Sequence, residues 1–246
     1  MGIILCKLLC GNFRYERVVD ESNGPKSGLC VDEDRGAAER AGALRHGTGM
    51  LREMVDSAST PLSTSIPVPR RIAVYCASAI GSNPAYRAEA EALGRAIAAA
   101  GMGLVYGGAN CGLMGAVADA ALAGGAEVIG VLPEVLSGRE IAHAGLTRLE
   151  PVSSMHERKA RMVELADAFL ILPGGYGTLD ELLEAVTWAQ LKLHAKPCIL
   201  INTLHYWDGL LTFLDSAVQE GFLKPQYRGL MLAAANAEEA VRMVKG

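Results

Sequence analysis

A glycine-rich turn between a buried strand and a helix is the clearest chemical feature of the chain. Residues 168–172 form an apolar run typical of a strand buried on both faces. The run ends in the turn PGGYG (residues 173–177), and a helical pattern follows at once. Glycines let the backbone approach an anion, and the N–H groups of the first helical turn point at it, where the helix dipole favours negative charge. The turn therefore favours a phosphate site.

Thr178 and Glu181, which follow the turn, have two interpretations. In the first, the Thr178 hydroxyl adds a donor to the phosphate site and Glu181 places a carboxylate one turn into the helix. In the second, Thr178 and Glu181 form a capping box and merely satisfy each other's backbone N–H groups. The sequence leaves both interpretations open.

Arg158 is a second candidate. Ser154 and Glu157 predict another capping box, which opens a helix. Its apolar stripe consists of Met155, Met162 and Leu165. Arg158 falls on that stripe, and a charge on a buried face needs a partner. The partner is either a structural carboxylate or an anionic ligand, since the fork of arginine donors suits phosphate. Glu140, in the irregular connection 133–146, is by itself typical of a solvated loop acid.

The composition is that of an ordinary globular protein with no polyanionic partner. The chain has 246 residues, of which 50% are hydrophobic, and its formal net charge is -4. Without a basic stripe, nucleic acid is excluded as the main partner. No apolar run reaches the ~18 residues that a membrane span needs. The six cysteines lack a CxxC pair, which favours buried thiols in a reducing, cytoplasmic setting over disulfides or zinc.

Two parts of the chain differ in pattern. Residues 1–69 lack apolar periodicity and end in a Ser/Thr/Pro-rich stretch, so we expect an N-terminal extension that is mostly disordered. Residues 70–246 alternate β-rich runs with helical patterns. The expected strands are 72–76, 104–106, 128–132, 148–152, 168–172, 198–201 and 230–232. This alternation predicts one α/β domain, a doubly wound, Rossmann-like parallel sheet with helices on both faces. Such sheets bind ligands at the carboxyl ends of their strands, where the strand order reverses.

Other chemistries have less support in the residues. The histidines show no HxH or HxxxH spacing, so no metal site is expected. Nothing around Lys159 or Lys192 distinguishes either as a Schiff-base lysine. The turn after the first strand, CASAIG (residues 76–81), does not match the GxGxxG dinucleotide fingerprint, which argues against a dehydrogenase.

Two spaced motifs resemble those of a known family. SMHERKARM (residues 154–162) followed by PGGYGTLDE (residues 173–181) resembles the paired signature of the Lonely Guy (LOG) family, whose members are often mislabelled lysine decarboxylases. The resemblance extends over essentially all of residues 71–245, including YGGANCGLMG, GREIAH, VTWAQ and VQEGFL. It implies a homodimeric phosphoribohydrolase that releases cytokinin bases from riboside 5′-monophosphates. Related members cleave AMP.

The resemblance also assigns roles by position. It implies that Arg158 and Glu181 are the catalytic pair. The implied substrate contacts are Glu140, Lys159, Gly174, Gly175, Tyr176, Gly177, Thr178, Thr187, Gly107 and Gly108. By analogy with O-glycoside cleavage, the carboxylate would stabilise an oxocarbenium-like ribose while the glycine loop binds the 5′-phosphate. The partner is then a small nucleotide, and no metal or redox cofactor is implied.

Two departures from the family pattern carry expectations. The chain has Gly107-Gly108-Ala109 where the family usually has three glycines, and Cys76-Ala77-Ser78 where Cys-Gly-Ser is common. An added methyl at either place is expected to narrow the approach of backbone to ligand and to alter substrate preference. The rival functions are a nucleotide-binding sensor or carrier of the same fold without turnover and, less favoured, a pyridoxal-phosphate decarboxylase. The presence of both Arg158 and Glu181 favours an enzyme.

Overall fold

The computed structural model describes residues 70–134 and 142–245, so the expected N-terminal extension lies outside the described residues. The strands are β1 (Arg71–Tyr75), β2 (Gly103–Tyr106), β3 (Val128–Pro133), β4 (Arg148–Val152), β5 (Ala168–Ile171), β6 (Cys198–Ile201) and β7 (Met231–Ala234). The helices are α1 (Pro84–Ala99), α2 (Gly112–Ala123), α3 (Met155–Leu165), α4 (Tyr176–Gln190), α5 (Asp208–Gln219), α6 (Pro225–Arg228) and α7 (Ala237–Lys245), with a 3-10 turn, η2 (Thr203–His205).

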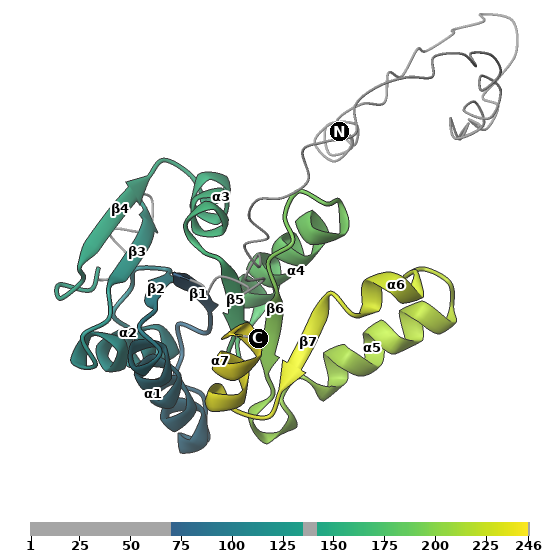
Figure 1. The fold of residues 1–246 in the computed structure, drawn as a ribbon, viewed down its shortest axis with the longest axis horizontal. Helices are drawn as coiled ribbons and strands as arrows, with labels where there is room; N and C mark the ends of the chain where they lie inside the picture. Colours follow the sequence, from purple (N-terminus) through teal and green to yellow (C-terminus); the bar gives the residue numbers. More distant parts are fainter. Residues whose placement is uncertain (1–69, 135–141, 246) are drawn as a thin grey trace, which may run out of the picture. The chain divides into compact units, whose positions relative to one another are not determined.

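All seven strands form one parallel sheet in the order β4-β3-β2-β1-β5-β6-β7 (Figure 1). The chain moves outward from β1 to β4, returns to the other side of β1 as β5, and continues to β7. The strand order therefore reverses between β1 and β5. This confirms the expected doubly wound sheet and predicts that ligands bind where β1 and β5 end.

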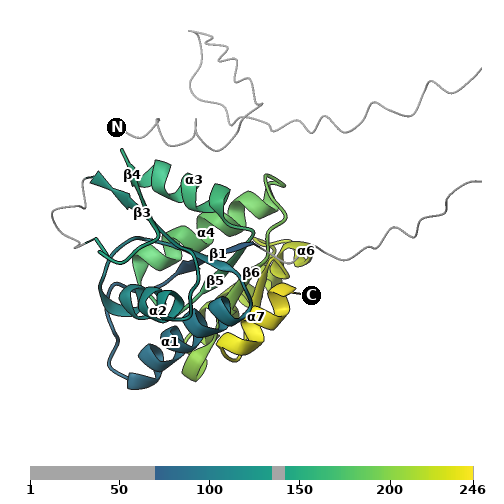
Figure 2. The same cartoon turned by 60° about the vertical axis from the view of Figure 1, so that its left-hand side comes forward.

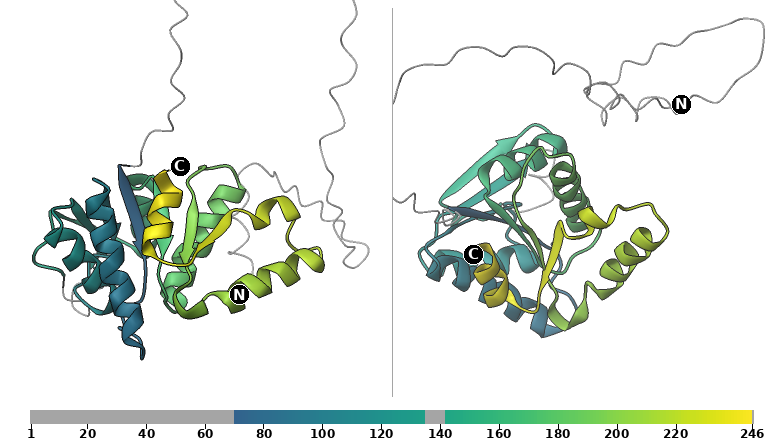
Figure 3. Two further views of the ribbon diagram at one scale, coloured as in Figure 1. Left: turned by 60° about the horizontal axis from the view of Figure 1, so that its bottom comes forward. Right: turned by 45° about the vertical axis from the view of Figure 1, so that its right-hand side comes forward.

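Helices cover both faces of the sheet (Figure 2). Alternate residues of β1 point to opposite faces, so Ile72 and Val74 pack with α1, α2 and α7, whereas Ala73 and Tyr75 pack with α3 and α4. In Figure 3, α5 and α6 (yellow-green) stand out from the sheet at its β7 end, and no residue of either helix is fully buried. Across the described ranges, no helix is long and apolar enough to cross a membrane.

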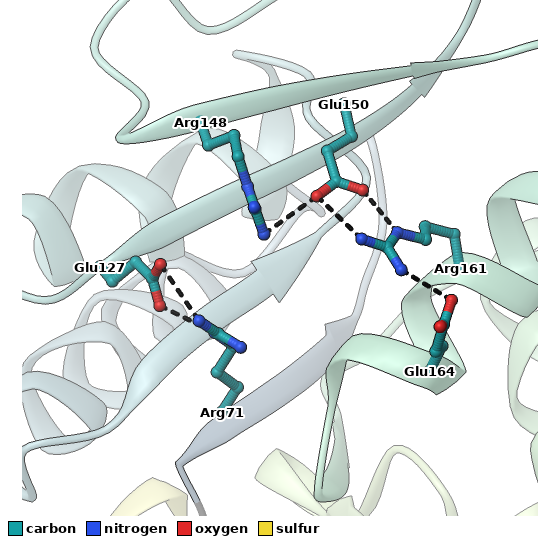
Figure 4. A network of polar contacts seen from close by, with 6 residues as sticks. All are labelled: Arg71, Glu127, Arg148, Glu150, Arg161 and Glu164. Atoms are coloured by element: carbon teal, nitrogen blue, oxygen red, sulfur yellow. Dashed lines mark hydrogen bonds and ion pairs between the residues drawn. The ribbon is translucent and has the colours of Figure 1, made fainter.

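Ion pairs join the β4 edge of the sheet to its neighbours (Figure 4). Glu150 of β4 accepts from Arg161 of α3 (2.6 Å) and pairs with Arg148 (2.9 Å). A separate ion pair joins Arg71 of β1 to Glu127, the residue before β3 (2.7 Å). The hydrogen bond from Arg161 is the main cause that lowers the pKa of Glu150. The network therefore holds α3, which carries Arg158, against the sheet.

The observed N-caps of α1 and α3 can be compared with the caps that the sequence predicts. Asn83 caps α1 as its position before Pro84 predicts, accepting from the Ala85 N–H at 2.9 Å. Ser154 caps α3, but the Glu157 carboxylate returns to the Ser153 N–H (2.7 Å) and not to that of Ser154.

The capping-box interpretation of Thr178 and Glu181, one of the two that the sequence leaves open, is wrong. Helix α4 begins at Tyr176, which lies two residues before Thr178, and its N-cap is Gly175. Thr178 is therefore the third residue of the helix, and Glu181 lies beyond its first turn. Because neither residue occupies a capping position, the side chain of Glu181 needs another explanation.

Candidate active site

A cavity of about 320 Å³ lies where β1, β2 and β5 end. This is the edge of the sheet at which the strand order reverses. Its described lining comes from the loops after β1 and β2 and from α2, α3 and α4. The lining residues are Val74, Cys76, Ala77, Ser78, Ala79, Gly107, Met114, Arg158, Gly175, Tyr176, Gly177, Thr178 and Glu181. The fold thus brings the two sequence motifs into one site.

The start of α4 lines the cavity and is the candidate anion site. No side chain among the described residues caps this helix, and its first turn holds no acidic residue. A Cβ built on Gly175 or Gly177 would meet no described atom within 4 Å, so packing does not require glycine there. Gly174 differs, because a Cβ there would overlap the buried side chain of Thr178. A helix start that lacks a side-chain cap and lines a cavity is the arrangement that receives a phosphate.

Arg158 reaches the cavity from the first turn of α3. It is only 7% exposed. Its Nη2 lies 3.7 Å from Oε1 of Glu181 and 3.5 Å from the carbonyl oxygen of Gly107. Among the described residues, its buried Nε has no hydrogen-bond partner. A buried guanidinium with an unused donor, facing a cavity, is suited to an anionic ligand.

Gly107 makes room for this arginine. A Cβ at Gly107 would overlap Nη2 of Arg158. The glycine is therefore explained by the packing of Arg158, a role that the sequence alone did not reveal.

The Glu181 carboxylate affects the titratable groups at the end of β1. Glu181 is 9% exposed and lies beside Arg158. Burial, followed by the charge of Glu181, raises the pKa of the Cys76 thiol. The same two causes raise the pKa of Tyr75. Since the thiol stays protonated near neutral pH, Cys76 forms part of the wall and is not a nucleophile.

Lys159, adjacent to Arg158, lies outside the described lining. Its ammonium group pairs with Glu184 (2.7 Å) and Asp180 (3.0 Å) on α4. Burial alone lowers the pKa of Lys159, but the two carboxylates together outweigh burial and the pKa is raised. A lysine held charged in this way joins α3 to α4 and is a poor nucleophile.

Of the other residues predicted to contact the substrate, only Tyr176 lies at the cavity in the part of the chain that the structure describes. Thr187 is exposed on α4, where its hydroxyl donates to the Leu183 carbonyl (2.6 Å). Gly108 has φ +84 and packs against Leu132, away from the described lining. Tyr176 is 94% exposed and stands at the rim of the cavity. Glu140 lies outside the described residues.

The two departures from the family pattern, Ala77 and Ala109, lie in different surroundings in the structure. Ala77 lines the cavity, as expected. Ala109 does not: it is fully buried in the core beside α2, so the expectation that its methyl narrows the ligand site is wrong.

Sequence reasoning did not name Met114 of α2, or Ala79 in the loop after β1, as part of the site. The signal was available, because that loop follows the strand at which the order reverses.

Comparisons with known proteins identify the family. Residues 114–244 match a family described as possible lysine decarboxylase. The chain is 48% identical over 176 residues to the cytokinin riboside 5′-monophosphate phosphoribohydrolase LOG7 of Arabidopsis thaliana, covering 72% of this chain and 81% of that protein. It is 44% identical over 189 residues to the enzyme of the same name from Rhodococcoides fascians, covering 76% and 96%.

The chain belongs to the LOG family. The same fold occurs in the molybdenum cofactor carrier protein of Chlamydomonas reinhardtii, with a TM-score of 0.53 and 22% identity over 71% of this chain and 95% of that one. The molybdenum cofactor binding protein of Rippkaea orientalis gives a TM-score of 0.54 at 23% identity, over 71% and 93%. The LOG fold therefore also serves proteins whose names indicate cofactor carriage.

Proposed function

We propose that this LOG-family protein hydrolyses the N-glycosidic bond of cytokinin riboside 5′-monophosphates, and of AMP, giving the free base and ribose 5-phosphate. The observation that carries the proposal is the placement of Arg158 and Glu181, 3.7 Å apart and both buried, beside an uncapped helix start. Relatives at 44–48% identity bear the name of this activity.

Each part of the site has a role in this reaction. The N–H groups at the start of α4 bind the 5′-phosphate, and that binding energy fixes the ribose for attack. Water adds to the anomeric carbon as the bond to the base nitrogen breaks, and positive charge develops on the ribose. Overall, the water loses one proton and the departing base nitrogen gains one, which gives the free base and ribose 5-phosphate. The Glu181 carboxylate stabilises that charge and orients the water. Arg158 holds the ribose and phosphate side with its remaining donors.

The direct test is incubation of the purified protein with isopentenyladenosine monophosphate and with AMP. We expect free base and ribose 5-phosphate in equal amounts. Tight nucleotide binding without either product would support the alternative, a non-catalytic nucleotide sensor or carrier, and would overturn the proposal.

Lysine decarboxylation, which the family description suggests, has less support. No lysine occurs in the described lining of the cavity. Lys159 is held by two carboxylates outside it, and Lys192 lies in the turn after α4. A pyridoxal cofactor needs a lysine that can lose its proton and reach the site. We expect no carbon dioxide release from lysine with added pyridoxal phosphate.

We further propose that the protein is a homodimer. The described surface exposes large apolar side chains on α4, on α5 and in the turns after them. They are Leu183, Leu191, Leu193, Phe213 and Phe222. Exposed apolar groups of this size are typical of interfaces. Light scattering should give twice the chain mass, and a monomer mass at micromolar concentration would contradict the proposal.

A cytoplasmic location is also proposed, on the thiols. Cys76 and Cys198 are buried and unpaired with another cysteine, and burial raises the pKa of Cys198 to about 12. Inert, reduced thiols are typical of a reducing compartment. Cell fractionation tests this, and recovery with secreted proteins would contradict it.

A further inference from the structure

Tyr206, in the turn after β6, contacts the glycine loop of the site directly. Its hydroxyl donates to the carbonyl oxygen of Gly174 at 2.7 Å. The ring of Tyr206 packs edge-on against Tyr86 of α1, with centroids 5.8 Å apart. A side chain from a neighbouring strand's loop therefore holds the backbone that precedes the anion site.

This bond determines the direction of one anion donor. The Gly174 carbonyl and the Gly175 N–H belong to the same planar trans peptide, so they point in opposite directions. A hydrogen bond that fixes the carbonyl also fixes the N–H. Gly175 lines the cavity and is the N-cap of α4. By holding Gly174, Tyr206 thus controls where the Gly175 N–H points.

The turn that carries Tyr206 is strained. Leu204 (φ 53, ψ 32) and His205 (φ 60) are consecutive non-glycine residues in the left-handed region. Such conformations persist only where surrounding structure imposes them, and they cluster at functional sites. Here Asn202 imposes the left-handed conformation. The side-chain oxygen of Asn202 accepts from the Trp207 N–H (2.7 Å), and its backbone carbonyl accepts from the His205 N–H (3.0 Å).

Core packing does not explain the Tyr206 hydroxyl. The neighbouring Trp207 is 3% exposed and fills the core, whereas Tyr206 is 42% exposed. Because Tyr206 is not enclosed in the core, burial does not by itself account for the bond to Gly174. The bond is better explained by its effect on the loop.

We propose that Tyr206 is a positioning residue for binding of the substrate 5′-phosphate. It orients the Gly174–Gly175 peptide so that the Gly175 N–H faces the anion. The identity of the ligand rests on the proposed function. The Gly175 N–H meets the phosphate both in the bound substrate and during the reaction, so loss of this one bond raises KM more than it lowers kcat.

The test compares Tyr206→Phe with the unchanged protein by calorimetry, using AMP and adenosine as probes. We expect the Kd for AMP to rise about 3- to 10-fold, the effect of one hydrogen bond. The Kd for adenosine, which lacks the phosphate, should stay the same. In turnover assays KM should rise by a similar factor. Tyr227→Phe, which removes a hydroxyl from α6, is the matched control and should change none of these values.

Three results would overturn the proposal. These are an unchanged AMP affinity in Tyr206→Phe, an equal loss for AMP and adenosine, or an unchanged protein that binds both probes equally. An equal loss would mean that Tyr206 is merely structural. Failure of the proposed function looks different: the unchanged protein would prefer AMP over adenosine yet release no base, and the Tyr206 comparison would still be valid.

Discussion

Replacing Gly107 by alanine puts a methyl group where the Arg158 guanidinium now lies. The new Cβ would overlap Nη2 of Arg158 and come within 2.9 Å of Sδ of Met114. Both atoms are ends of flexible side chains, and the backbone of Gly107 is not in the left-handed region. Both side chains can therefore withdraw, so we expect the free energy of unfolding to fall by about 1 kcal/mol, the lower end of the usual cost of overpacking.

Catalysis should suffer far more than stability. To restore normal contact, the guanidinium must withdraw by about 1 Å or more from its present place beside Glu181. A misplacement of about 1 Å in a catalytic constellation costs on the order of 10²-fold. We therefore expect kcat/KM for isopentenyladenosine monophosphate to fall about 100-fold in Gly107→Ala, with the melting temperature lowered by no more than about 4 °C.

The assay pairs steady-state kinetics with thermal melting. Gly209→Ala is the control, because a Cβ at Gly209 in α5 would meet no described atom within 4 Å. It should keep full activity. Near-normal kcat/KM in Gly107→Ala would refute the role given to Arg158, and so would a loss of activity that is matched by loss of folded protein.

Two further predictions concern stability. Arg161 lowers the pKa of Glu150 below its ordinary value of 4.5, so the pair stabilises the fold above about pH 4.5 and stops doing so as the pH falls through the lowered pKa. Glu150→Gln should therefore lower the denaturation midpoint at pH 7, and the difference from the unchanged protein should shrink in acid; a difference that does not depend on pH would contradict this. Leu204→Asn should raise the free energy of unfolding by up to about 1 kcal/mol, because asparagine tolerates the left-handed region better than leucine does. Denaturant titration measures this change, and a lowered midpoint would show that Leu204 is not strained.

Much of the fold follows from pattern alone. An apolar run placed β6 at its observed ends, and the expected ranges of the other strands lie within two residues of the observed ones. For β4 the expected and observed ends agree although its sequence, RLEPV, is not an apolar run. Asn83 before Pro84 located the start of α1, because the capping side chain of Asn83 and the ring of Pro84 are both recognisable in the sequence. The glycine turn at residues 173–177 was equally visible, since it is contiguous in the sequence.

Other features depend on contacts that local sequence does not encode. The start of α4 was misplaced because its N-cap is Gly175, which has no capping side chain to signal it. Ala109 faces the core because Gly108, with φ +84, turns the chain just before it. The contact of Tyr206 with Gly174 joins residues 32 positions apart, and only the neighbouring positions of β5 and β6 bring them together.

The central claim is that the Glu181 carboxylate acts on the reacting ribose, and Glu181→Gln tests it most directly. The amide keeps the size of the side chain and removes its charge, while the phosphate site at Gly175 and Gly177 is untouched. We expect AMP to bind with similar affinity and to be hydrolysed at least about 100-fold more slowly, the loss typical of removing one group that stabilises transition-state charge. Near-normal hydrolysis by Glu181→Gln would contradict the account.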